Sequence, residues 1–192
     1  EDAPEAYNMI LSEKCHYSGI IIKYNSDCIF SNGNYLIPEN VHSVQKRLPV
    51  IGFIGAGNFA QNVLLPGLKG NADLKGVATA HGNTSVYVGR KFGFRYCTSD
   101  SNAIIDDPTI NTVFIITRHN LHSDLSIKAF KAGKNVFVEK PLALTINDLE
   151  VLRDEYYSAK GPSLIMVGYN RRFAPFTQLL NQKFNNHQPK GI

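Results

Sequence analysis

The stretch Val50-Ile51-Gly52-Phe53-Ile54-Gly55-Ala56-Gly57-Asn58-Phe59-Ala60 decides the fold. Its first half is a short apolar run, the pattern of a strand buried on both faces of a parallel sheet. Its second half has the spacing Gly-x-Gly-x-x-Ala. In that spacing Gly55 permits a tight turn, Gly57 lets a pyrophosphate approach the backbone, and Ala60 lets a helix pack closely. Because a strand precedes the motif and a helical pattern follows it to Leu68, the stretch predicts a dinucleotide-binding loop, with a ligand-free turn as the alternative.

Strand-like and helix-like segments alternate along the chain from residue 49 onward. Further strands are predicted at residues 74–80, 94–97, 112–116, 135–138 and 163–167, and further helices at residues 84–92, 100–105, 121–132, 145–159 and 174–185. Repeated strand–helix alternation is typical of an α/β protein with a doubly wound parallel sheet, the Rossmann arrangement.

Composition narrows the function classes. The 192 residues are 43% hydrophobic and 19% charged, which argues against disorder, and no apolar run approaches the roughly 20 residues of a membrane-spanning helix. The net charge of +4 comes from dispersed basic residues, so it disfavours nucleic-acid binding.

The cysteines Cys15, Cys28 and Cys97 lack zinc-like spacing, which predicts reduced thiols, a cytoplasmic protein and no metal site. The opening Glu1-Asp2-Ala3-Pro4 is neither an initiator Met nor a secretory signal, and we expect a processed product or a cut chain.

The end of the second predicted strand lacks the acidic residue that is common in dinucleotide-binding sites. A carboxylate about 20 residues after the glycine motif binds the adenosine ribose in many dinucleotide sites. The sequence here is Val77-Ala78-Thr79-Ala80-His81-Gly82-Asn83, without an acid and without an adjacent arginine. Thr79 and His81 are the candidate ribose contacts, and the choice between NAD and NADP stays open.

The tripeptide Glu139-Lys140-Pro141 follows the strand predicted at residues 135–138. Ligands of open α/β sheets bind at the carboxyl ends of the strands. An ammonium group placed there can hydrogen-bond a substrate oxygen or take part in proton transfer. The alternative is an ordinary surface turn.

Together these motifs resemble the glucose-fructose oxidoreductase, inositol dehydrogenase and MocA family (Gfo/Idh/MocA). The segments that carry the resemblance are residues 55–60, Thr117-Arg118-His119-Asn120-Leu121-His122, residues 132–143 with Glu139-Lys140-Pro141, and residues 167–175. It covers about residues 49–192 and implies an NAD- or NADP-dependent oxidoreductase that acts on CH–OH groups of sugars, polyols or nucleotide sugars.

The resemblance also implies site residues. It places Lys140 as the catalytic residue at the substrate oxygen, and it implies a cis Lys140–Pro141 peptide bond. Arg118 departs from the family pattern, which usually has proline there. The implied cofactor-binding residues are Gly55, Ala56, Gly57, Asn58 and Phe59 at the pyrophosphate, and Thr117, Arg118, Asn120, His122, Glu139 and Lys140 around the nicotinamide. Asn170, Arg171 and Arg172 would stand at the rear of the cleft.

The two ends of the chain carry separate expectations. Residues 1–25 resemble the closing helix and strand of medium-chain, zinc-type alcohol dehydrogenases, which suggests a fragment of a fusion protein. We therefore expect a linker at 26–48, a Rossmann domain at 49–170, and at 171–192 the start of a truncated substrate domain. The family's C-terminal α+β sheet domain, with a catalytic His or Asp, would lie beyond residue 192, so we expect the fragment to be inactive alone.

The leading hypothesis is thus the cofactor-binding domain of a hydride-transferring oxidoreductase. The expected partner is a sugar-like small molecule, with no nucleic acid and no membrane, and the intact protein would form a homo-oligomer. The alternative is a non-catalytic dinucleotide-binding or scaffolding module, which the neutral second strand end and Arg118 favour.

Overall fold

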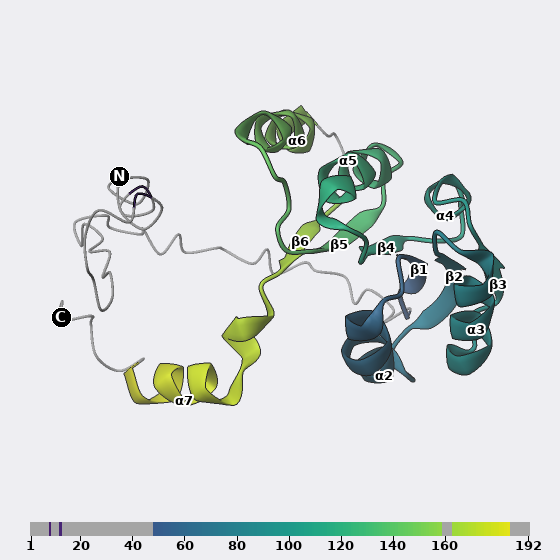
Figure 1. The fold of residues 1–192 in the computed structure, drawn as a ribbon, viewed down its shortest axis with the longest axis horizontal. Coiled ribbons are helices and arrows are strands. Elements are labelled where there is room, and N and C mark those ends of the chain that lie inside the picture. Colours follow the sequence, from purple (N-terminus) through teal and green to yellow (C-terminus); the bar gives the residue numbers. More distant parts are fainter. Residues whose placement is uncertain (1–7, 9–11, 13–47, 159–162, 185–192) are drawn as a thin grey trace, which may run out of the picture. The chain divides into compact units, whose positions relative to one another are not determined.

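The computed structural model describes residues 8, 12, 48–158 and 163–184. Within the compact unit Ser43–Asn181 it contains one sheet of six parallel strands in the order β3-β2-β1-β4-β5-β6 (Figure 1). The strands are β1 (Val50–Ile54), β2 (Asp73–Ala78), β3 (Tyr96–Thr98), β4 (Thr112–Ile115), β5 (Asn135–Glu139) and β6 (Ile165–Gly168). The order reverses between β1 and β4, as in Rossmann sheets, and the predicted fold class is confirmed.

The helices fall close to the predicted ranges. They are η1 (Ala60–Leu64), α2 (Leu65–Leu68), α3 (Gly82–Phe92), α4 (Asn102–Ile105), η2 (His119–Leu121), α5 (His122–Lys131), α6 (Ile146–Ser158), η3 (Asn170–Phe173) and α7 (Pro175–Phe184). The helix after the glycine motif begins with a wide π turn, in which the Leu65 N–H donates to the Ala60 carbonyl. Pro66 follows at once, has no N–H and crowds the carbonyl four residues back, so the regular pattern is interrupted there.

Two apolar clusters hold helices on the two faces of the sheet. Side chains alternate between faces along each strand. Ile51 and Phe53 therefore join one cluster with Leu65 of α2 and Val88 of α3. The other cluster brings together residues of β1, β2, β4, β5, α4 and α5. Stacked rings of Phe53, Phe114 and Phe137, with centroids 4.9 and 4.8 Å apart, link β1, β4 and β5 on one face.

Local signals in the sequence account for the helix ends. Gly93 after α3 and Gly133 after α5 have φ of +79° and +72°, the left-handed conformation that commonly terminates a helix. At the start of α6 the Thr145 hydroxyl oxygen accepts a hydrogen bond of 3.1 Å from the Asp148 N–H, the contact that a threonine makes at a helix N-terminus.

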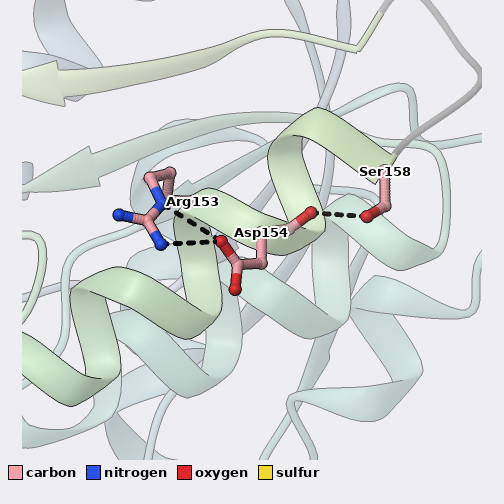
Figure 2. A network of polar contacts seen from close by, with 3 residues as sticks. All are labelled: Arg153, Asp154 and Ser158. Carbon is pink, nitrogen blue, oxygen red and sulfur yellow. Dashed lines mark hydrogen bonds and ion pairs between the residues drawn. The ribbon is translucent and has the colours of Figure 1, made fainter.

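The polar contacts at the end of α6 lie on the exposed surface. Arg153 donates from Nε and Nη2 to Asp154 Oδ1, each at 3.0 Å, and the Ser158 hydroxyl donates to the Asp154 carbonyl oxygen at 2.6 Å (Figure 2). Exposed pairs of this kind add between about zero and 1 kcal/mol, so this network is a minor feature of the helix end.

Lys134 is a buried charged residue that fixes the loop before β4. Only 7% of it is exposed, and its ammonium donates to the carbonyl oxygens of Asp107 and Ile110 at 2.7 and 2.8 Å. A second contact to the same loop comes from the Tyr96 hydroxyl, which donates a hydrogen bond to the Asp107 carboxylate. Burial, together with the neighbouring Asp107, raises the pKa of Tyr96 to about 12.

Replacing Lys134 with methionine should lower the free energy of unfolding by about 2–3 kcal/mol, because two loop carbonyls lose their buried donor. Urea unfolding followed by circular dichroism measures this loss. Lys128→Met on the exposed surface of α5 is the matched control, with an expected change within about 0.5 kcal/mol. Equal effects of the two substitutions would show that the buried contacts of Lys134 do not stabilise the fold.

The predicted N-terminal helix and strand at residues 1–25 and the linker at 26–48 lie outside the described residues, apart from positions 8, 12 and 48. In the part of the chain that the structure describes, every helix is too short or too polar to cross a bilayer.

Candidate functional site

A cleft of about 720 Å³ opens at the carboxyl ends of β1, β4, β5 and β6. It lies beside the point where the strand order reverses, the usual ligand position in open α/β sheets. Its size is within the range of about 300–1,000 Å³ typical of small-molecule and cofactor sites. The residues that line it are Gly57, Asn58, Phe59, Ile116, Thr117, His119, His122, Glu139, Lys140, Gly168, Tyr169, Asn170, Arg171 and Arg172.

The glycine loop forms one wall of this cleft. Gly55 has φ of +89°, and a Cβ atom there would collide with the Ile116 carbonyl, so the turn requires glycine. Gly57 is exposed, and a Cβ atom there would meet nothing within 4 Å. Ala56 and Ala60 are buried beneath the loop. The space over Gly57 is therefore a cradle that a side chain would fill, and the open backbone suits a bound pyrophosphate.

On the other side of β4 from the glycine loop, the cleft is lined by Glu139, the last residue of β5, and by Lys140, which follows it. The Glu139 carboxylate accepts hydrogen bonds from the Asn170 side-chain amide at 3.0 Å and from the Lys140 N–H at 3.3 Å. A Cβ atom on Gly168 would approach Glu139 Oε1 to 2.5 Å, so the bare backbone of Gly168 makes room for this carboxylate. The Lys140–Pro141 peptide is cis, as the resemblance implies. Lys140 is exposed in the cleft, and within the described ranges its ammonium has no ion-pair or hydrogen-bond partner.

Positive charge dominates this end of the cleft. Among the described residues that line it, Lys140, Arg171 and Arg172 are cationic, and Glu139 is the one carboxylate. The Arg172 guanidinium donates to the Val167 carbonyl at 3.4 Å and lies 4.9 Å from the centre of the Phe173 ring. An excess of cations in a concave site favours anionic ligands.

The segment Thr117–His122 contributes only some of its predicted residues. Thr117 and His122 line the cleft, whereas Arg118 and Asn120 are exposed and lie outside the lining, and His119 takes a place in it. Arg118 adopts φ of −70°, a value that the proline usual at this position also takes. The departure therefore adds a charge without a change of backbone.

Thr79 and His81 lie beyond the cleft, after β2. The Thr79 hydroxyl donates to the His81 carbonyl at 2.8 Å, so it serves the local turn that precedes α3. The segment directly after β2, residues 79–83, contains neither a carboxylate nor an arginine that would distinguish NAD from NADP.

Four residues of the cleft were not among the predicted site residues, namely Ile116, His119, Gly168 and Tyr169. Ile116, Gly168 and Tyr169 share one signal, because each stands at or just after the carboxyl end of a strand. Across the described positions, no three His, Cys, Asp or Glu side chains gather closely enough to hold a metal ion.

Several known proteins are similar to this chain in sequence and in fold. Over 106 residues the chain is 38% identical to levoglucosan dehydrogenase of Pseudarthrobacter phenanthrenivorans, covering 55% of this chain and 26% of that protein. Over 132 residues it is 32% identical to scyllo-inositol 2-dehydrogenase (NAD(+)) of Bacillus subtilis, covering 68% and 37%. The solved structure of levoglucosan dehydrogenase in complex with NADH and levoglucosan superposes with a TM-score of 0.64 at 30% identity, covering 71% of this chain and 39% of that one. The chain thus spans well under half the length of these relatives.

The family comparison covers the whole described sheet. The sequence pattern of the family described as "Oxidoreductase family, NAD-binding Rossmann fold" matches residues 50–169, which run from the first residue of β1 to just beyond β6. The chain belongs to the Gfo/Idh/MocA family of oxidoreductases with an NAD-binding Rossmann fold.

Proposed function

We propose that this chain is the cofactor-binding domain of an NAD- or NADP-dependent oxidoreductase that acts on the CH–OH group of a sugar, polyol or nucleotide sugar. One observation carries the proposal: one cleft is lined both by the open backbone of Gly57 and by the ammonium of Lys140, which has no ion-pair partner among the described residues. The levoglucosan and inositol dehydrogenases among its relatives support the substrate class.

Different residues of the cleft would bind the pyrophosphate and the nicotinamide half of the cofactor. The backbone N–H groups of Gly57, Asn58 and Phe59, at the start of the following helix, would hold the pyrophosphate. Thr117, Glu139 and Asn170 would border the nicotinamide half. When bound, the nicotinamide ring accepts or supplies a hydride.

Lys140 is the group that would act on the substrate. Its ammonium would donate a hydrogen bond to the reacting oxygen and so stabilise the negative charge that develops there. Among the described residues of the lining, Lys140 carries the one ammonium group. The acid or base that completes the proton transfer would come from a further domain, which residues 171–192 would begin. The relatives' greater length supports that proposal. The alcohol-dehydrogenase-like interpretation of residues 1–25 stays a prediction.

The 192-residue chain should bind NADH yet turn over no sugar, because positioning of the substrate supplies much of an enzyme's acceleration. Nicotinamide fluorescence measures binding, and absorbance of NADH measures turnover with a panel of polyols, sugars and nucleotide sugars. Steady reduction of NAD by the chain alone would contradict the proposed division between domains. Absence of NADH and NADPH binding would favour the scaffolding alternative.

Lys140→Met should separate binding from chemistry in a longer form of the protein that shows turnover. We expect kcat to fall by about 10²–10³, the usual effect of removing one donor from a developing oxyanion, with little change in cofactor affinity. Lys128→Met on α5 is the control, and its kcat should match that of the unmodified protein. A Lys140→Met protein with normal kcat would assign the oxygen chemistry to another residue.

A further inference from the structure

His122 joins two loops that follow neighbouring strands. It is the first residue of α5 and has no exposed surface, although it lies at the wall of the cleft. Its Nδ1 lies 2.7 Å from the Pro141 carbonyl oxygen, beyond β5, and its Nε2 lies 3.2 Å from the Thr117 carbonyl oxygen, beyond β4. A buried ring with both nitrogens directed at backbone carbonyls has no free nitrogen for a cofactor.

The two contacts are not equivalent. A carbonyl oxygen only accepts, and a neutral imidazole carries a single N–H donor. The shorter distance assigns that proton to Nδ1, which donates to Pro141. The bond to Pro141 is therefore the stronger of the two contacts.

Pro141 immediately follows Lys140, the residue that acts on the substrate in the function proposed above. The Lys140 side chain is exposed, and among the described residues the Lys140 N–H donates to the side chain of its neighbour Glu139 alone. The bond from His122 thus ties this turn to the first residue of a helix packed on β4 and β5. A helix start is more rigid than an exposed turn, so it can fix where the Lys140 ammonium stands.

We propose that His122 is a positioning residue, which orders the Glu139–Lys140–Pro141 turn through Pro141 and does not itself touch the cofactor. The proposal rests on the proposed function for the role of Lys140, whereas the contact with Pro141 can be tested without cofactor. If His122 only filled space in the core, it would not matter which of its two ring nitrogens forms a hydrogen bond.

Two substitutions distinguish these roles. In His122→Asn the side-chain amide nitrogen can occupy the place of Nδ1 and keep the bond to Pro141. In His122→Gln it can occupy the place of Nε2 and reach Thr117 instead. Both remain polar, and glutamine is nearer to histidine in size, so a space-filling role predicts that glutamine is the better substitute.

Two NMR measurements need no cofactor. The ¹³C resonance of the Pro141 carbonyl should stay at its unmodified position in His122→Asn and move upfield in His122→Gln, which lacks the donor. In the unmodified chain, the ¹⁵N resonances of the His122 ring should show a proton on Nδ1. A ring protonated on Nε2 alone overturns the proposal, and this result is available even if both variants fail to fold.

Acetylation of Lys140 with and without NADH reports on the position of the ammonium. Mass spectrometry gives its rate relative to Lys128, an exposed residue on α5. We expect NADH to shield Lys140 equally in the unmodified chain and in His122→Asn, and about five- to tenfold less in His122→Gln, the usual effect of one lost hydrogen bond. Equal shielding in the two variants overturns the positioning role. If NADH shields Lys140 in neither variant nor the unmodified chain, the proposed function is contradicted, and the Pro141 resonance then decides about His122.

Discussion

Replacing Gly57 with valine should weaken NADH binding by at least about a hundredfold while the stability of the chain stays the same. The reason is the open space over Gly57, where an added Cβ atom meets no protein atom within 4 Å. Valine can therefore be accommodated by the fold, yet its branched side chain occupies the place where a pyrophosphate would contact the backbone. Nicotinamide fluorescence measures the affinity, and urea unfolding measures the stability.

Gly67→Val provides the matched control for this experiment. Gly67 lies in α2, outside the cleft lining, and a Cβ atom there also meets nothing within 4 Å. Its affinity for NADH should equal that of the unmodified chain. If Gly57→Val binds NADH as tightly as Gly67→Val, the glycine loop does not hold the pyrophosphate and the proposed function loses its main support.

Gly55→Ala, unlike Gly57→Val, should destabilise the fold. We expect it to lower the free energy of unfolding by about 2–5 kcal/mol. A left-handed backbone costs an L-residue roughly 1–2 kcal/mol. An overpacked position adds about 1–3 kcal/mol. Both apply to Gly55, which has φ of +89° and faces the Ile116 carbonyl. Because the obstacle is backbone, it cannot move aside as a side chain would.

Gly70→Ala separates the two contributions. Gly70 has φ of +78° but no atom near the position of its Cβ, so only the left-handed backbone is penalised there. Urea unfolding should show a loss of about 1–2 kcal/mol for Gly70→Ala and a larger loss for Gly55→Ala. Equal losses would mean that the Ile116 carbonyl does not constrain the turn.

Strands β1 and β4 could be predicted from the sequence because each is an almost continuous apolar run. Residues 112–116 illustrate this, since β4 covers Thr112–Ile115. The prediction was less accurate for β3, which covers Tyr96–Thr98 instead of residues 94–97. Phe94 suggested strand because it is apolar, but it is buried through its ring, which meets the Phe53 ring edge-on at 5.7 Å. Tertiary packing of this kind leaves no trace in local periodicity.

The site was predictable to the extent that its residues fall in contiguous motifs. Gly57 and Lys140 could be placed at the cleft because each stands in a motif directly after a strand. His119 could not, because local sequence does not show which residue of a short loop faces inward. The resemblance implies that His122 lies at the nicotinamide, but local sequence does not show that both of its ring nitrogens lie near backbone carbonyls.

The strand order has a consequence for how the chain folds as it is synthesised. β1, which lies between β2 and β4 in the finished sheet, is made before either of them. Its β2 edge can be covered early, but its β4 edge stays open until the chain has been extended to Ile115, several seconds later at about 5–20 residues per second. The cleft comes later still, since its far wall needs β6. One edge of the apolar strand β1 therefore stays exposed while the chain is being synthesised. Parallel sheets are prone to aggregate in this state.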